Sequence, residues 1–274
     1  MVKTSKQLIK ERLEQIANTL LLNGTLVESP GIICGKLGLA IFFFHYARYT
    51  ENLLFADYAM DLIDKMQNQI HVNTSADYEK GIAGIGVGID YLIQNKFLLV
   101  EGDICEDLDE RMFRAVMYDP WFGYSLYDGL IGYGRYWISR LPYQKVEKQA
   151  IICLEQIVSL IEKDISSIPI REQTDVYCFL SDLQKIHGFE KKINLLEYCW
   201  TWKDKDSFSR LGDSMQGCAV RNIQCKRYFY KIYENDFDIN ETPKTMGLLN
   251  GYAGAGLFLL EMLYDTNYLW AFLL

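Results

Sequence analysis

Residues 81–93 read GIAGIGVGIDYLI, a G-x-x-G-x-G pattern that leads directly into an apolar segment. The pattern recurs in three other segments, which are 35–40 (with alanine in the last place), 129–134 and 251–256. The first three copies in the chain begin 46 and 48 residues apart. A period of this length is typical of helical-hairpin repeats, in which a glycine-rich turn begins an inner helix and an outer helix returns. A dinucleotide-binding glycine motif would follow a β-strand and occur once. The pattern in this chain recurs and follows turn-like or acidic sequence, so that kind of site is excluded.

The segments around these glycines have helical periodicity throughout the chain. Amphipathic windows at 5–22, 52–70 and 144–162 predict helices, and alternating β-branched runs are few. The inner segment 37–46 is apolar on nearly every side, so its helix must be covered on most sides. We expect the repeat glycines to serve packing, since small residues let helices approach closely and glycine tolerates the φ of a turn. The fold class is therefore all-α.

We predict a single α/α-toroid domain over residues 1–274, with six hairpin units in an inner and an outer layer of helices. Closure of the ring would pair the helix that begins at Ser5 with the last inner helix, which runs to about Leu263. An open solenoid is the alternative, but solenoids need polar capping repeats, whereas the segment 268–274 is apolar. Residues 142–245 have room for two units without the glycine pattern, and Gly217 is a candidate remnant of one.

The composition limits the classes of partner. Lys and Arg number 28 against 36 Asp and Glu, a net charge of −8, which argues against a broad nucleic-acid-binding surface. No apolar signal-peptide core follows the N-terminus, and the apolar segment 37–46 is too short to span a bilayer. Seven dispersed cysteines without a CxxC pair indicate reduced thiols. We expect a cytoplasmic protein that binds neither membranes nor nucleic acids.

The segments 81–93, 127–141 and 247–263 together resemble the repeats of the lanthionine synthetase C-like (LanC-like) family. The resemblance covers most of residues 30–141 and 246–264. It implies an α/α toroid of seven hairpins and a zinc-dependent cyclase. Such an enzyme adds a peptide cysteine thiol to dehydroalanine or dehydrobutyrine, which forms a thioether ring. The implied partners are a precursor peptide or a peptide-modifying enzyme of a ribosomal-peptide (lanthipeptide-type) pathway.

The zinc ligands of that family are absent from the recognisable repeats. In the family, one ligand is a cysteine shortly before a repeat glycine, and two more form a Cys-His pair directly before another. This chain has no Cys-His pair, and His187-Gly188 comes closest to the family's proton-transfer histidine. We therefore expect no zinc and no other cofactor. A different metal site in the middle of the chain would draw on residues whose spacing matches no zinc pattern: Cys178, His187, Cys199, Cys218 and Cys225.

The residues directly before the repeat glycines are the candidate site. They are Cys34, Lys80, Asp128 and Asn250. In a ring of repeats they would meet at one mouth, at helix N-termini, which favour anions such as a thiolate. We assign Cys34, Lys80 and Asn250 to substrate binding. Tyr127 and Asp128 are assigned to catalysis, because an acidic residue in a Tyr-Asp element is associated with the family's active site. The alternative is turn chemistry, with Asp128 as the N-cap of the following helix.

Two further features have simpler interpretations. His45 lies in an apolar segment, and we expect a buried histidine with its hydrogen bonds satisfied. The acidic stretch 101–110 lacks calcium-loop spacing and is explained by the dipole of a helix that begins there. Two functions remain open for the chain: a thioether-forming cyclase with an altered site, and a zinc-free scaffold that binds the precursor peptide or a partner enzyme.

Overall fold

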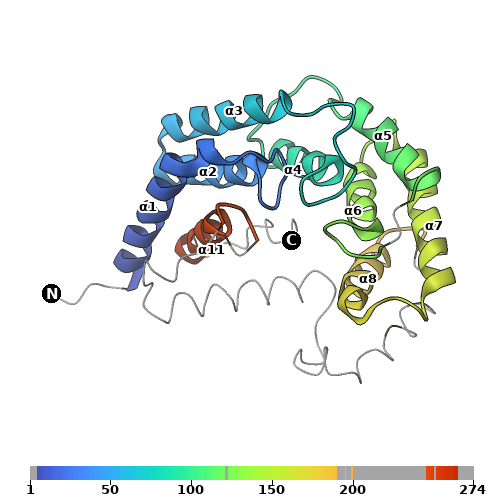
Figure 1. The fold of residues 1–274 in the computed structure, drawn as a ribbon. Coiled ribbons are helices and arrows are strands. Elements are labelled where there is room, and N and C mark those ends of the chain that lie inside the picture. The colour runs from blue at the N-terminus through green and yellow to red at the C-terminus, as the bar shows by residue number, and fades with distance from the viewer. Residues whose placement is uncertain are drawn as a thin grey trace. The chain divides into compact units, whose positions relative to one another are not determined.

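A computed structural model describes residues 5–120, 123–189, 195, 199, 245–249 and 251–264 (Figure 1). Its regular structure in these residues is entirely helical, which confirms the all-α prediction. The helices are α1 (Ser5–Asn23), the short 3-10 helix η1 (Gly24–Leu26), α2 (Lys36–Thr50), α3 (Leu53–Gln67), α4 (Ile82–Gln94), α5 (Glu106–Met117), α6 (Leu130–Arg140), α7 (Glu147–Asp164), α8 (Ile170–Leu183) and α11 (Tyr252–Tyr264). No helix in this described part is long and apolar enough to cross a membrane.

The chain forms two compact units. The first unit comprises Met1–Ser75, Glu79–Leu99 and Ile223–Leu274, and the second comprises Ala76–Tyr78 and Val100–Asn222. Each unit is considered by itself below. The single toroid domain over residues 1–274 stays a prediction.

In the first unit, helices from both ends of the chain are neighbours. The N-terminal helix α1 packs against α11, and α11 packs against α2, which also contacts α3 and α4 (Figure 1). Helix α2 is buried continuously from Lys36 to Ala47, as its apolar sequence predicts. Helix α3 is amphipathic, with one buried stripe that includes Leu62 and Met66. The pairing of α1 with α11 is the contact that a closed ring of repeats requires.

In the second unit, α6 packs against α5, α7 and α8. Helix α8 lies in the part of the chain that lacks the glycine pattern, yet most of its residues from Val176 to Leu183 are buried. A Cβ atom on Gly134 of α6 would lie closer than 3.0 Å to the Phe179 ring of α8. In the first unit, Gly256 of α11 stands in the same relation to Phe42 of α2. Helix α8 therefore packs beside α6 as one inner helix packs beside the next.

The four inner helices α2, α4, α6 and α11 begin in the same way. The first residue after each repeat glycine donates its N–H to a carbonyl seven residues earlier. The bonds are Lys36 to Ser29 (2.9 Å), Ile82 to Ser75 (2.9 Å), Leu130 to Gly123 (2.9 Å) and Tyr252 to Thr245 (3.1 Å). Each loop thus folds back over the start of its own helix and satisfies an N–H group that would otherwise lack a partner. The four segments are structural repeats.

Space, rather than φ, explains the repeat glycines. Gly35, Gly81 and Gly129 have extended backbones with φ of −120°, −102° and −120°, which any residue adopts. The predicted need for an unusual turn conformation is therefore wrong at these positions. A Cβ on Gly35 would instead lie closer than 3.0 Å to the backbone of Gly31, and one on Gly132 to the Leu126 carbonyl oxygen. The folded-back loop leaves no room for a side chain.

Candidate functional site

Three repeat loops of the first unit lie side by side. The Leu248 N–H donates to the Ile33 carbonyl (2.7 Å), and the Ile33 N–H donates to the Glu79 carbonyl (3.3 Å). The loops that precede α11, α2 and α4 are therefore adjacent, in that order. Two glycines permit this contact, each four residues before its repeat glycine. A Cβ on Gly247 would lie closer than 3.0 Å to the backbone of Ile33 and Cys34, and one on Gly31 to the backbone of Glu79 and Lys80.

This junction brings Cys34 and Lys80 together, two of the residues assigned to substrate binding. Cys34 lies in the middle loop and is half-buried. The Lys80 ammonium lies 3.7 Å from a carboxylate oxygen of Glu79, and the two side chains are 60% and 34% exposed. The third assigned residue, Asn250, lies outside the described residues. Glu79, which the sequence analysis did not single out, completes the set of polar side chains around Cys34.

The surroundings of Cys34 favour the protonated form of its thiol. Burial raises the pKa of Cys34, the negative charge of Glu79 raises it further, and Lys80 opposes both. The first two N–H groups of α2 are already bonded within the chain. Lys36 donates to the Ser29 carbonyl (2.9 Å) and Leu37 to the Pro30 carbonyl (3.3 Å). Neither N–H group is available to the anion expected there.

We expect Cys34 to react more slowly with iodoacetamide at pH 8 than a free cysteine does, because the thiolate is the nucleophile. Glu79→Gln removes a charge that raises the pKa of Cys34, so it should shift the pH–rate profile to lower pH and speed the reaction. Lys80→Gln should shift the profile to higher pH. Peptide mapping by mass spectrometry gives the rate at Cys34, with the buried Cys153 as an unreactive internal reference. Profiles that coincide for the two variants would contradict the assigned charges.

Tyr127 and Asp128 lie in the second unit, at a junction of the same kind. The Tyr78 N–H donates to the Tyr127 carbonyl (2.9 Å), as Leu248 donates to Ile33. Asp128 is exposed, and its carboxylate accepts a hydrogen bond from the Ser125 hydroxyl. The Ser125 oxygen accepts in turn from the N–H groups of Tyr127 and Asp128 (3.2 Å each).

The N-cap of α6 is Gly129, without a side-chain cap, so the alternative role of Asp128 as N-cap is wrong. Ser125 holds the Asp128 carboxylate instead. The catalytic assignment of Tyr127 and Asp128, and the clustering of Asp128 with Cys34 and Lys80, stay predictions.

In the second unit, carboxylates of α8 contact the loop that precedes α6, at the place where the next repeat loop would lie. The Leu126 N–H corresponds by register to those of Tyr78 and Leu248, and it donates to Asp175 Oδ2 (2.6 Å). The Tyr124 N–H donates to Glu172 Oε2 (2.8 Å), and Glu172 is buried. A side chain here replaces the carbonyl that a glycine-rich loop supplies elsewhere. The repeat that begins near α8 therefore lacks the glycine pattern but retains the contact.

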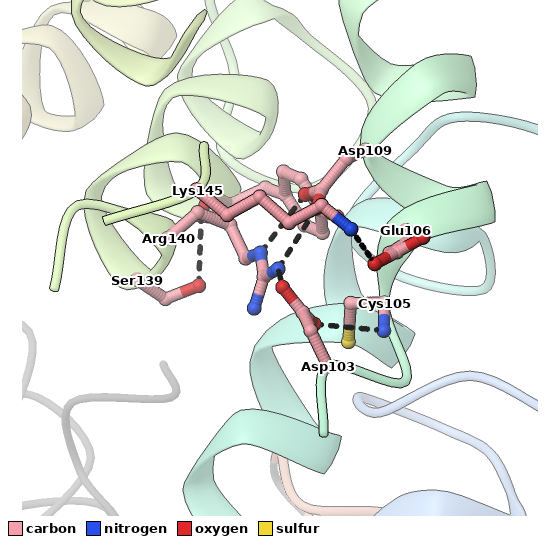
Figure 2. A network of polar contacts seen from close by, with 8 residues as sticks. Asp103, Cys105, Glu106, Asp109, Ser139, Arg140 and Lys145 are labelled. Carbon is pink, nitrogen blue, oxygen red and sulfur yellow. Dashed lines mark hydrogen bonds and ion pairs between the residues drawn. The ribbon is translucent and has the colours of Figure 1, made fainter. Parts of the chain in front are cut away.

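A buried ionic clamp surrounds Arg140 at the end of α6 (Figure 2). The Arg140 guanidinium donates from Nε to Asp109 Oδ1 (2.9 Å) and from Nη2 to Asp109 Oδ2 (2.8 Å), and it also pairs with Asp103. The Tyr136 hydroxyl donates to Asp109 Oδ1 (2.6 Å). Burial lowers the pKa of Arg140, but the bonds to Asp109 and Asp103 outweigh it and raise the pKa above its ordinary value.

The clamp revises the interpretation of the acidic stretch 101–110. Glu106, Asp107 and Asp109 do lie in the first turn of α5, as the dipole argument requires. Asp103 and Asp109 have a second role, because they fix the end of α6 to the start of α5. The partners Asp109 and Arg140 are 31 residues apart, so local sequence patterns carried no signal for this pair.

His45 is buried and satisfied, as predicted. Its Nε2 lies 2.7 Å from the Tyr91 hydroxyl, which occupies the same register in the next repeat. Burial, together with the charge of Arg48, lowers the pKa of His45 to about 3, so the imidazole is neutral at physiological pH. His187 is exposed, and Gly188 has φ of +98°, unlike the repeat glycines. The backbone at Gly188 therefore differs from that of the repeat glycines.

The cysteines of the described residues other than Cys34 are buried thiols: Cys105, Cys153, Cys178 and Cys199. Burial raises the pKa of Cys153 and of Cys199 to about 12. Among the residues that the structure describes, no group of three or more His, Cys, Asp or Glu side chains could hold a metal ion. Gly217, Cys218 and Cys225 lie outside that set, so a metal site that includes these cysteines stays untested.

The chain was compared with protein-family models and with curated proteins. No family model matches the chain, and no curated protein matches it.

Proposed function

We propose that the chain is a LanC-like protein of a ribosomal-peptide modification pathway in the cytoplasm, where it binds a precursor peptide without zinc. The proposed architecture is a closed α/α toroid of six hairpin units. Four inner helices with the same loop-to-helix hydrogen bond support the repeat part of this proposal. The packing of α1 against α11, and of α11 against α2, supports closure. Helix α8, which keeps the junction contact without the glycine pattern, supports a further unit.

The peptide would bind where the repeat loops meet. In the first unit, the loops before α11, α2 and α4 are fixed side by side by backbone hydrogen bonds. The side chains of Cys34, Glu79 and Lys80 come from two of these loops and are partly exposed. A rigid row of loops that carries polar side chains suits a partner with many hydrogen-bonding groups, and a peptide is such a partner.

The state of Cys34 favours binding over zinc-dependent cyclisation. A cysteine binds zinc as the thiolate, and burial and Glu79 raise the pKa of this thiol. Thioether formation also needs a nucleophilic thiolate on the peptide, which the family obtains from its metal. The cyclase is the second candidate. The exposed carboxylate of Asp128, beside Tyr127, favours it, because such a group can transfer the proton at the enolate carbon.

A dehydrated precursor peptide with one cysteine distinguishes the two functions. Ring formation leaves the mass unchanged, so free thiol is counted by alkylation and mass spectrometry, and binding is measured by fluorescence anisotropy. We expect binding with full retention of the thiol, and a matched Cys-to-Ala peptide should bind equally. Loss of the thiol that Asp128→Asn abolishes would establish the cyclase and reject the binding-only function. The absence of binding would reject both.

A further inference from the structure

Four leucines of α1, η1 and α3 are exposed to solvent, and we call them the leucine patch: Leu21, Leu22, Leu26 and Leu54. Leu22, Leu26 and Leu54 are 77%, 74% and 72% exposed. Large apolar side chains that gather on one face of a protein, rather than singly, mark an interaction site. Contact with a partner would remove the apolar surface of these leucines from water, which favours binding.

The two parts of the leucine patch meet at Tyr58. Helices α1 and α3 both lie against α2 (Figure 1). The Tyr58 hydroxyl of α3 donates to the Leu21 carbonyl (3.4 Å), and a Cβ on Gly24 would lie 2.7 Å from the same hydroxyl oxygen. The chain from Leu21 to Leu26 therefore passes beside α3 at Tyr58. Leu54 is four residues before Tyr58, so it lies one turn away on the same face of α3.

Acidic side chains surround this apolar surface. The two segments that carry the patch, 14–28 and 51–65, contain six acidic residues and one base, Lys65. Asp57 and Asp61 follow Leu54 by three and seven residues, so they share its helix face, and both are exposed. Burial raises the pKa of Tyr58, and the charge of Asp61 raises it further. Neither carboxylate forms an ion pair with the residues that the structure describes.

We propose that the leucine patch binds an amphipathic helix of a partner protein, with apolar residues on one face and Lys or Arg beside them. The leucines make the apolar contact, and Asp57 and Asp61 accept charge-assisted hydrogen bonds from the basic residues. The same charges disfavour two other occupants. A second copy of this chain would bring two acidic surfaces together, and an anionic lipid surface would be repelled. The patch includes none of the junction residues Cys34, Glu79 and Lys80, so this interaction is independent of the proposed function.

The test uses the full chain and two acetylated helical peptides, one of leucine and lysine and one with glutamate in place of each lysine, measured by isothermal titration calorimetry. Both peptides present the same leucine face, so their comparison measures the effect of charge. We expect the lysine peptide to bind one per chain and at least tenfold more tightly than the glutamate peptide. The Leu22→Ser/Leu54→Ser double variant should weaken lysine-peptide binding at least tenfold, and Asp57→Asn/Asp61→Asn should weaken it about fivefold.

Two matched controls test whether the effect belongs to the patch. Leu99→Ser removes an exposed leucine from the same unit, and Glu155→Gln/Glu162→Gln removes two exposed carboxylates from α7. Both proteins should bind the lysine peptide as the unaltered protein does. Because Leu22 and Leu54 are exposed, their replacement should leave thermal unfolding nearly unchanged, and circular dichroism checks this.

Three results would overturn the proposal. The first is equal binding of the lysine and glutamate peptides by the unaltered protein, a comparison that needs no variant. The second is unchanged lysine-peptide binding by the leucine double variant. The third is a different occupant, seen as a dimer in analytical ultracentrifugation, or as binding to vesicles of anionic phospholipid, that the leucine double variant abolishes.

Discussion

Arg140→Met is expected to lower the free energy of unfolding by about 3–5 kcal/mol, the usual cost of removing one partner from a buried ion pair. The Arg140 side chain is 1% exposed and that of Asp109 is 4% exposed. Methionine fills much of the same space but leaves the carboxylates of Asp109 and Asp103 without their cation. Of the hydrogen bonds to Asp109 described above, only the one from the neutral Tyr136 hydroxyl would remain.

Chemical denaturation followed by circular dichroism measures this effect, and an exposed ion pair next to the clamp provides the control. Lys145→Met is the same kind of substitution at the neighbouring pair with Glu106. The Lys145 side chain is 66% exposed, so solvent screens the pair and the substitution should leave the stability nearly unchanged. Equal stability of the Arg140→Met and Lys145→Met proteins would contradict a buried clamp.

Gly247→Ala is expected to destabilise the first unit by about 3 kcal/mol, at the upper end of what overpacking costs. The new methyl group would meet the Ile33 carbonyl oxygen and the Cys34 Cα closer than 3.0 Å. Both are backbone atoms, which cannot rotate away as a side chain can. Relief of the clash requires the loops to separate, which breaks the hydrogen bond from Leu248 to Ile33. Gly31→Ala should behave alike, because it faces the backbone of Glu79 and Lys80.

Gly102→Ala is the control for a loop glycine without close neighbours. Nothing lies within 4 Å of its Cβ position, but its φ of +83° makes alanine cost about 1 kcal/mol. Thermal unfolding of the three proteins ranks the substitutions. If Gly247→Ala and Gly31→Ala cost no more than Gly102→Ala, the repeat loops are not in contact.

The sequence predicted the helices that have an amphipathic pattern within their own segment. The windows 52–70 and 144–162 correspond to α3 (Leu53–Gln67) and α7 (Glu147–Asp164). The repeat register also identified the starts of four inner helices. The register did not locate the start of α8, because the packing contact of this helix uses the side chains of Glu172 and Asp175 in place of a glycine-rich loop.

The register also located Cys34 and Lys80 at one junction, but it did not reveal their chemistry. Glu79 changes the pKa of Cys34 across a contact between two loops, and no spacing within either loop encodes that contact. The clamp at Arg140 was missed for the same reason. Its members lie in different segments, and only tertiary packing brings them together.

Metal analysis of the protein purified without added metal tests the zinc-free proposal most directly. Inductively coupled plasma mass spectrometry should find zinc far below one atom per chain, and Cys34→Ser should not change that value. About one zinc atom per chain, bound by cysteine side chains and lost on their substitution, would contradict the proposal and restore the zinc-dependent cyclase.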